Sequence, residues 1–351
     1  MPSLKSPVKG AFFVRILMNK ILVTGGAGYI GSHCVLRLLK DGVKVVVFDN
    51  LSTGHIETLD TLKKYGDLIF VKGDLQNKED LKNVFKEGDI SAVIHFAAFS
   101  QVGESVKDPQ KYYFNNVYGT LNLLEAMLQK NVKRIVFSST AATYGEPNYV
   151  PIDENHVQNP VNPYGNTKFF IEKILDDYDK AYGLKSIRLR YFNVAGASSE
   201  GVVGEWHEPE THLIPNVLKS ALDESKVFKL FGSDYDTKDG TCVRDYINIE
   251  DLIDAHIKAL NYIFENNKTD YFNLGTKTGN SIKEVFSLCE KAIDKKINIE
   301  MCPRRDGDPA ILVADNGKAK EILGWNSEKS LEHSIKTAYE WENNLLRKFK
   351  T

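Results

Sequence analysis

The glycine-rich segment near the start of the chain constrains the fold more than any other feature. Three glycines with GxxGxxG spacing follow an apolar run at 20–23 and open a helical pattern at 30–39. Glycine permits a tight turn and lets a pyrophosphate approach the backbone, and a helix N-terminus offers free N–H groups to phosphates. We therefore predict a strand, a turn and a helix that together bind a dinucleotide. The residues expected to contact it here are Gly25, Gly28, Tyr29, Ile30 and Gly31.

Further apolar, β-branched runs recur along the chain and alternate with helical patterns. The expected strands are 20–23, 44–48, 68–71, 92–96, 134–138 and 186–191, and the helices between them include 30–39, 78–85 and 112–129. Such alternation indicates βαβ units and a parallel sheet, and near-continuous apolar strands indicate that both faces of the sheet are covered. We predict an α/β fold with a Rossmann-type doubly wound parallel sheet and a smaller mixed α/β substrate-binding domain.

The regular alternation ends near Asn193, where the chain becomes rich in Gly, Ser, Asp and Glu. A strand–turn–helix pattern then returns, and the C-terminal part mixes short strands and helices. We expect a dinucleotide-binding domain at 18–193, joined again by 242–262. The substrate domain is expected at 194–241 and 263–347.

Residues 1–17 are expected to be a leader of uncertain order, outside the folded domains. They contain basic residues and a short apolar run, but Arg15 interrupts that run, which is not typical of a signal peptide. No apolar stretch reaches the roughly 20 residues that a membrane-spanning helix needs. We therefore expect no membrane partner.

Cysteine usage and charge exclude other classes of protein. Four cysteines are scattered at 34, 242, 289 and 302, without a CxxC pair or a nearby histidine cluster. This pattern favours reduced thiols in the cytoplasm over a disulfide framework or a metal site, so no metal is expected. The formal net charge of −2 provides no positive field to attract nucleic acid.

The second expected strand ends at Asp49, 18 residues after Gly31. A carboxylate there binds ribose hydroxyls and repels a 2′-phosphate, and no arginine follows it. We therefore predict NAD rather than NADP as the cofactor, the alternative being a nucleotide-free α/β domain. Asp74 also follows a strand, and its carboxylate is placed to bind the adenine amino group. The cofactor contacts expected at these strand ends are Asp49, Asn50, Asp74, Leu75, Phe96, Ala97 and Ala98.

Tyr164 and Lys168 lie four residues apart after Pro163, so they share one face of a predicted helix. A free phenol, with a pKa of about 10, is a poor base at neutral pH. A nearby ammonium and a positive nicotinamide ring stabilise the phenolate. Thr140 at the end of an expected strand offers a hydroxyl that orients an alcohol. The three residues together predict acid–base chemistry, whereas the Tyr–Lys spacing alone also fits a helix surface.

At this point the motifs resemble a known family. TGGAGYIG, HFAA, SSTAATYG and YGNTK are similar to the extended short-chain dehydrogenase/reductases, and RYFNVAG, DGTCVRDYI and RRDGDPA resemble the UDP-glucose 4-epimerase branch. The resemblance covers about residues 18–345. It implies reversible interconversion of UDP-galactose and UDP-glucose. Tyr164 would take the proton of the sugar 4-hydroxyl while hydride passes from C4 to NAD, and the 4-keto sugar would rotate and receive the hydride on its other face.

The same resemblance assigns residues to both ligands. Asn193, Arg244 and Arg305 are implied to hold the UDP diphosphate, for which a guanidinium is well suited, and Asp308 the uridine ribose. The implied substrate contacts are Thr140, Tyr164, Asn193, His212, Leu213, Phe231, Arg244, Arg305, Asp308 and Leu312. The residues implied on the nicotinamide side are Asn115, Ser138, Tyr164, Lys168 and Tyr191.

The chain departs from some family members at positions that bear on the site. Thr140 replaces a serine, which preserves the hydroxyl. Ser100 replaces a lysine beside the nicotinamide, and His212 replaces an asparagine, which puts both side-chain roles in doubt. Leu312 occupies a position where a large Tyr excludes N-acetylated sugars and a small residue admits them. Leucine is intermediate, so we expect UDP-galactose as the main substrate and some activity on UDP-N-acetylgalactosamine.

Competing functions remain open on the sequence. A 4,6-dehydratase is disfavoured because Ala141 and Ala142 follow Thr140, where dehydratases carry acidic residues. An epimerase or decarboxylase acting on UDP-glucuronate or UDP-N-acetylglucosamine is not excluded. An NAD-binding redox sensor is a further alternative, although it has no need of the three catalytic candidates.

A homodimer is the expected partner state, formed through helices around 112–129 and 164–180. Tyr112, Tyr113 and Phe114 are predicted to supply apolar surface for it.

Overall fold

The computed structural model describes residues 19–222, 227–304 and 309–349, so the leader at 1–17 lies outside the described residues. Seven strands form one sheet in the order β11-β6-β5-β4-β1-β2-β3, and every neighbouring pair is parallel. Their bounds are β1 Lys20–Thr24, β2 Lys44–Asp49, β3 Leu68–Lys72, β4 Ile90–His95, β5 Arg134–Thr140, β6 Lys185–Tyr191 and β11 Asp270–Leu274. The predicted doubly wound parallel sheet is confirmed.

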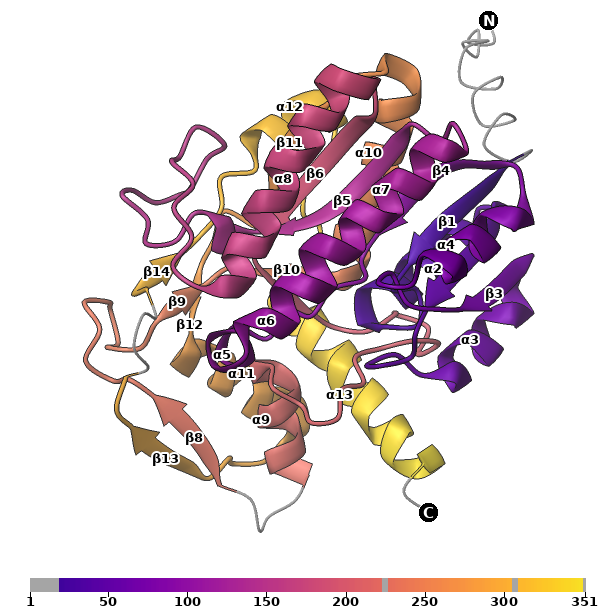
Figure 1. Ribbon diagram of the computed structural model, residues 1–351. Helices are drawn as coiled ribbons and strands as arrows, with labels where there is room; N and C mark the ends of the chain where they lie inside the picture. The colour runs from indigo at the N-terminus through magenta and orange to yellow at the C-terminus, as the bar shows by residue number, and fades with distance from the viewer. Residues whose placement is uncertain (1–18, 223–226, 305–308, 350–351) are drawn as a thin grey trace, which may run out of the picture.

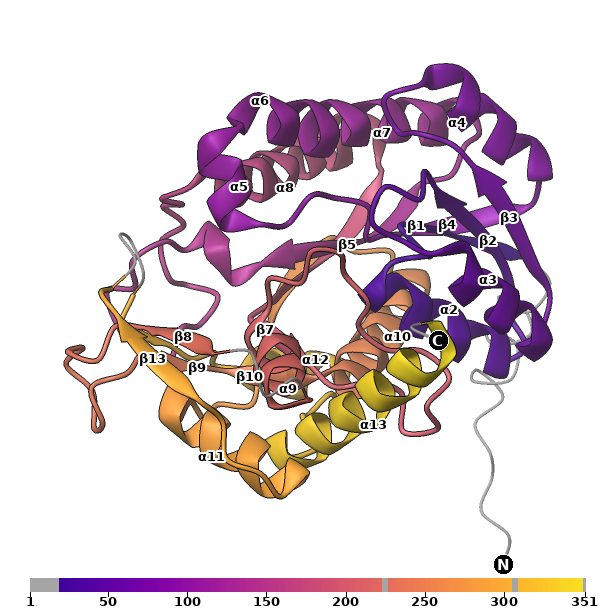
Figure 2. The same cartoon turned by 90° about the horizontal axis from the view of Figure 1, so that it is seen from below.

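Helices cover both faces of this sheet, as the strand sequences require (Figures 1 and 2). The core on one face is built with α2 Tyr29–Lys40, α3 Ile56–Leu62, α10 Ile249–Asn266 and α12 Gly317–Leu323. The core on the other face is built with α4 Lys78–Val84, α7 Gly119–Gln129 and α8 Pro163–Tyr182. Because both faces are buried, β1 and β2 carry only apolar side chains between their first and last residues, whereas β6 carries Ser186, Arg188 and Arg190.

Short elements join these layers. They are α5 Val102–Lys107, α6 Pro109–Tyr112, a π-helical segment η3 Tyr113–Tyr118, and the 3₁₀ turns η1 Lys63–Tyr65, η2 Phe85–Glu87 and η4 Ala141–Thr143. The single helix expected at 112–129 is therefore α6, η3 and α7 in succession. Tyr112 is fully buried in this arrangement, so the prediction that it provides surface for a partner is wrong.

The remaining elements surround a third core. Small sheets pair β7 Asn193–Ala195 with β10 Tyr246–Asn248, β8 Phe228–Phe231 with β13 Ile299–Cys302, and β9 Val243–Arg244 with β12 Asn280–Ser281 and β14 Ile311–Leu312. The helices here are α9 Leu213–Leu222, α11 Ile282–Ile293 and α13 Leu331–Phe349. Figure 2 shows this group below the sheet layer, beside its carboxyl edge.

The division of the chain into two domains stays a prediction, but two segments refine it. The returning segment at 242–262 contains α10, which packs on β5, β6 and α2. β11, from the range assigned to the substrate domain, pairs with β6 and forms an edge of the large sheet. Among the described residues, no helix combines the length and the apolar character needed to cross a bilayer.

Candidate active site

The glycine turn lies between β1 and α2, and each glycine has its own steric reason. Gly25 has a φ of +72°, and a Cβ on it would lie 2.6 Å from the backbone nitrogen of Ala97. A Cβ on Gly31 would lie 2.1 Å from the carbonyl oxygen of Gly25, so helix and turn pack in direct contact. Gly28 is different, because its only close neighbour would be that same oxygen at 3.5 Å. It leaves the N-terminus of α2 open.

No side chain caps this N-terminus, since the N-cap residue is Gly28 itself. Free N–H groups at the start of a 12-residue helix bind anions such as phosphate. The neighbouring side chains point elsewhere: the Tyr29 hydroxyl donates to the carbonyl oxygen of Gly196 at 2.6 Å, and Ile30 packs against the core. Contacts from Tyr29 and Ile30 to a dinucleotide would therefore come from their backbone groups.

Asp49 lies at the end of β2 and faces the glycine turn. Its carboxylate accepts hydrogen bonds from the backbone N–H groups of Ala27 at 3.0 Å and Leu51 at 2.8 Å. Burial raises the pKa of Asp49, and these two hydrogen bonds oppose the shift. Each carboxylate oxygen has two acceptor positions, so the group retains capacity for ribose hydroxyls.

The other predicted cofactor residues follow the neighbouring strands. Asn50 donates to the Asp74 carboxylate at 2.8 Å, which joins the ends of β2 and β3. The side chain of Leu75 is buried in the core, and its carbonyl oxygen accepts from Asn122. Phe96 and Ala97 both donate backbone N–H groups to the carbonyl oxygen of Thr24. Ala98 follows them and is partly buried. The sheet thus brings Gly25, Asp49, Asp74 and Phe96 to one edge.

α8 positions the catalytic candidates. The helix begins with Pro163 in its first turn, and the side chain of Asn162 accepts from the N–H of Gly165 at 2.8 Å. This cap fixes the helix start against the end of β5. Burial raises the pKa of Tyr164 to about 12, although the nearby Thr140 hydroxyl acts to lower it.

Lys168 is buried one turn further along the same helix. Its ammonium donates to the carbonyl oxygen of Ser138 at 2.9 Å and lies 4.8 Å from the centre of the Phe137 ring. Burial lowers the pKa of Lys168 to about 7, and the nearby Glu172 carboxylate opposes this shift. In the protein alone, burial therefore favours the neutral forms of both Tyr164 and Lys168.

Glu172, a third residue on this helix face, was missed by sequence reasoning. It accepts from the Ser139 hydroxyl at 2.5 Å, and Arg190 forms a buried ion pair with it. Arg190 in turn donates to the Tyr144 hydroxyl at 2.9 Å. The network ties β5, β6 and α8 together directly behind Thr140. The available signal was the i, i+4 spacing that Glu172 shares with Tyr164 and Lys168.

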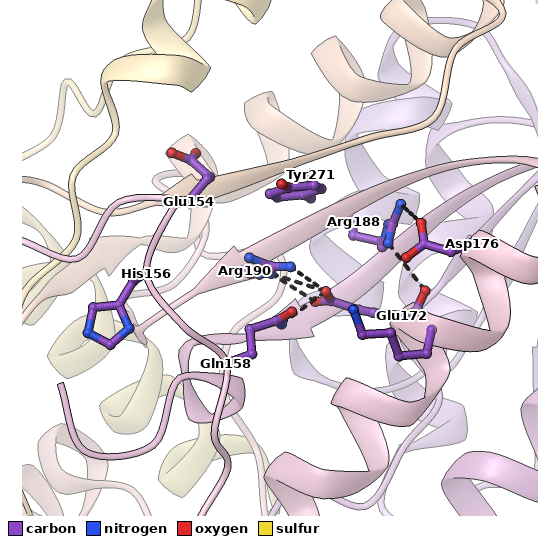
Figure 3. Close-up of a pocket in the computed structure, with 9 residues that line it drawn as sticks. Glu154, His156, Gln158, Glu172, Asp176, Arg188, Arg190 and Tyr271 are labelled. Atoms are coloured by element: carbon purple, nitrogen blue, oxygen red, sulfur yellow. Dashed lines mark hydrogen bonds and ion pairs between the residues drawn. The ribbon is translucent and has the colours of Figure 1, made fainter. Parts of the chain in front are cut away.

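A cavity of about 190 Å³ lies beside this network (Figure 3). Its lining consists of Glu154, His156, Gln158, Glu172, Lys173, Asp176, Arg188, Arg190 and Tyr271. In the wall of this cavity, Arg188 pairs with Asp176 at 2.7 Å and Arg190 pairs with Glu172. Both guanidinium charges are therefore already balanced. None of the described residues predicted to bind cofactor or substrate lines it. We assign it no part in the site.

The remaining nicotinamide-side candidates lie near Lys168. The Ser138 hydroxyl bonds to the imidazole of buried His256 at 3.1 Å, so this side chain is turned toward the core. Tyr191 ends β6, and burial raises the pKa of its hydroxyl while the nearby Ser138 acts to lower it. Asn115 lies in η3 and donates to Asn116 at 2.9 Å.

The substrate candidates are spread over the elements of the third core. Asn193 is exposed on β7, Phe231 ends β8, and Leu213 begins α9. Arg244 is buried on β9, and Leu312 lies opposite it on β14. His212 does not stand alone, because its imidazole contacts the carboxylates of Glu205 and Glu210. Arg305 and Asp308 lie outside the described residues.

Known proteins share this architecture and sequence over most of the chain. Residues 22–338 match the family described as GDP-mannose 4,6 dehydratase. A UDP-glucose 4-epimerase of Rhizobium meliloti (strain 1021) is 50% identical over 325 residues, which is 93% of this chain and 97% of that protein. One from Lactobacillus helveticus is 53% identical over 323 residues, covering 92% and 96%.

Solved structures agree with these relatives. The UDP-glucose 4-epimerase from Brucella ovis, in complex with NAD, has a TM-score of 0.87 and 45% identity over 92% of this chain and 98% of that one. The enzyme from Bifidobacterium longum, in complex with NAD+ and UDP, has a TM-score of 0.89 and 39% identity over 93% and 98%. Both carry a ligand with a diphosphate.

Proposed function

The chain belongs to the family of UDP-glucose 4-epimerases, and from that premise we propose that it interconverts UDP-galactose and UDP-glucose with NAD as cofactor. The observation that carries the proposal is the position of Thr140 and Tyr164. The Thr140 hydroxyl lies close enough to Tyr164 to lower its pKa, at the edge of the sheet that also carries the open glycine turn and Asp49.

The residues fit the cofactor by their geometry. The uncapped N-terminus of α2 and the open space at Gly28 suit a pyrophosphate, and Asp49 suits the adenosine ribose. We propose that Lys168 holds the nicotinamide ribose. NAD, when bound there, would supply reversible hydride transfer at sugar C4, with no net oxidation of the sugar.

The chain's own residues move the proton. We infer that Tyr164 takes the proton from the sugar 4-hydroxyl and later returns it to the same oxygen. A phenol with a pKa near 12 is almost entirely protonated at neutral pH and cannot accept a proton, so positive charge close to it must lower that pKa in the reacting complex. Lys168 provides one such charge when protonated. Thr140 orients the sugar oxygen toward Tyr164 through its hydroxyl.

The nucleotide half of the substrate would be bound by residues beside the third core. We propose that Asn193, Arg244 and Arg305 bind the diphosphate, that Asp308 binds the uridine ribose, and that Leu213 and Phe231 flank the base. Leu312 would border the sugar, because β14 places it directly beside Arg244. A dehydratase activity is disfavoured, because the short turn after Thr140 presents Ala141 and Ala142 and offers no acid.

The test is product analysis with purified protein and UDP-galactose, without added cofactor. UDP-glucose should accumulate to a constant ratio, and Tyr164→Phe should reduce turnover by about 100- to 10,000-fold. Tyr182→Phe, at the exposed end of the same helix, is the matched control and should retain activity. Near wild-type turnover in Tyr164→Phe would refute the assignment. If the protein turned over UDP-glucuronate but not UDP-galactose, the proposed identity of the substrate would be wrong.

We also propose a homodimer and a reducing cytoplasmic location. The helix layer of η3, α7 and α8 exposes Phe114, Tyr118 and Phe170, which are large apolar side chains on one face of the molecule. Such a patch is typical of a protein–protein interface. The location rests on the cysteines, three of which are buried in the fold.

A further inference from the structure

Four metal-ligating side chains lie together in the segment that precedes α9. They follow the spacing E-x-H-x2-E-x-H, and we call them the Glu–His cluster: Glu205, His207, Glu210 and His212. One nitrogen or oxygen from each lies within 4.8 Å of those of the other three. The cluster contains no cysteine, so the expectation of no metal site, which rested on cysteine spacing, did not consider it.

The distances between donor atoms match those of a metal site. Nδ1 of His212 lies 2.7 Å from Glu205 and 3.2 Å from Glu210. Nδ1 of His207 lies 3.2 Å from Glu205 and 3.9 Å from Glu210. Ligands at 2.0–2.1 Å from a tetrahedral Zn²⁺ are separated by about 3.3 Å. The four contacts lie on either side of that value, so small side-chain adjustments suffice.

A second observation points to a missing ligand. The Glu210 side chain is only 5% exposed, yet its Oε2 atom has no hydrogen-bond donor among the described residues. The buried Nδ1 of His207 lies 3.2 Å from Glu205, but without the geometry of a hydrogen bond. Both atoms point into the cluster. A buried polar atom without a partner is costly, and a cation between the two would satisfy both.

The surroundings hold the cluster in place. The backbone carbonyl of Glu205 accepts from the indole N–H of Trp341 on α13 at 2.9 Å. Lys219 lies 3.7 Å from Glu210, but it lies equally close to Glu342, which balances its charge. The edge of Tyr29 packs on His207 at 6.4 Å between ring centres. The partly exposed His212 leaves the cluster accessible from solvent.

We propose that the Glu–His cluster binds one divalent transition-metal ion, with Zn²⁺ the best fit. Two imidazole nitrogens and two carboxylate oxygens form a donor set that suits Zn²⁺ and not Mg²⁺ or Ca²⁺, which prefer oxygen ligands alone. All four ligands belong to the chain, so the site is structural. The ion would close the segment 205–212 on itself and fix the first residue of α9.

The experiment measures metal content and coordination of the purified full chain. After dialysis with Zn²⁺, the wild type should retain about one equivalent by mass spectrometry, and Co²⁺ in its place should give the strong visible bands of a tetrahedral site. His207→Gln and Glu210→Gln should each weaken Zn²⁺ binding by at least about 10-fold. His333→Gln, a histidine on α13 outside the cluster, is the control and should bind like the wild type.

The Co²⁺ spectrum is recorded on the wild type, so it still tests the proposal if a substitution prevents folding. A chelator should also lower the melting temperature of the wild type and of His333→Gln, but not that of the two cluster variants. The proposal fails if the wild type retains no more Zn²⁺ than His207→Gln, or if His333→Gln loses it equally. Weak, six-coordinate Co²⁺ bands would also overturn it.

Discussion

Asp49 shows how a single carboxylate takes part in both the fold and the choice of cofactor. It holds the glycine turn through Ala27 and Leu51, and its remaining acceptor positions are available to a ribose. We predict that Asp49→Ala reduces NAD binding by about 10- to 100-fold, the range expected for hydrogen bonds to a charged group, and relaxes the preference against NADP. Cofactor released from the purified variant, quantified by chromatography, checks this. Asp67→Ala, an exposed carboxylate at the amino end of β2 and β3, is the control. A variant that still carries only NAD would contradict the role.

Leu312 determines, in our interpretation, how large a substituent the sugar can carry at C2. It is partly exposed on β14 beside Arg244 rather than buried in a core, which favours a role at the substrate. Leu312→Tyr should reduce kcat/KM for UDP-N-acetylgalactosamine by about 10- to 200-fold and leave that for UDP-galactose much less affected. If both values fall equally and the melting temperature drops, Leu312 serves stability alone.

At the scale of elements, the Glu172–Arg190 pair links α8 to β6 behind the catalytic residues. Burial raises the pKa of Glu172, but Arg190 and the Ser139 hydroxyl outweigh it and leave the pKa below its ordinary value. A lowered pKa stabilises the folded state above the unfolded pKa of about 4.3, and this contribution disappears as the pH falls through the folded pKa.

Glu172→Gln should therefore destabilise the protein at pH 7 by about 3–5 kcal/mol, because it leaves Arg190 buried without its partner. Urea unfolding measures the difference, which should shrink below about pH 4 as the wild-type carboxylate takes up a proton. Glu340→Gln breaks only an exposed pair with Lys336 and should cost no more than about 1 kcal/mol. A pH-independent difference would contradict the electrostatic explanation.

The elements also show what a sequence can predict. The strands β1 to β6 and their order of appearance followed from apolar runs and turn signals, and the glycine turn and Tyr164–Lys168 face followed from spacing. The place of β11 did not, because its pairing with β6 joins residues about 80 positions apart and leaves no local pattern. The burial of Tyr112 was missed because only the packed helices cover it. The contacts of His212 were missed although Glu205 and Glu210 are near in sequence, because the segment has no regular periodicity that would predict them.

At the scale of the whole molecule, the exposed aromatic side chains of η3 and α8 lead to a prediction about assembly. Light scattering should give the wild type twice the 39.6 kDa mass of one chain. Phe114→Glu and Phe170→Glu should shift the mass toward the monomer, because a charge in an apolar interface is costly. Ile322→Glu, on exposed α12 at the opposite face of the sheet, is the control. A monomeric wild type would rule out the dimer.

The edge position of β11 has a consequence for the chain as it is synthesised. β6 ends at Tyr191, but the strand that covers its free side starts at Asp270, so the sheet stays one strand short while the intervening residues emerge from the ribosome. During that interval β6 exposes unpaired backbone groups, and parallel strands distant in sequence associate slowly. A chain interrupted before Asp270 would contain the whole glycine turn and the Tyr164–Lys168 pair. It would nevertheless expose a sheet edge that is prone to aggregation. The pairing of β11 with β6 therefore determines whether the new chain stays in solution, although the catalytic residues are already present.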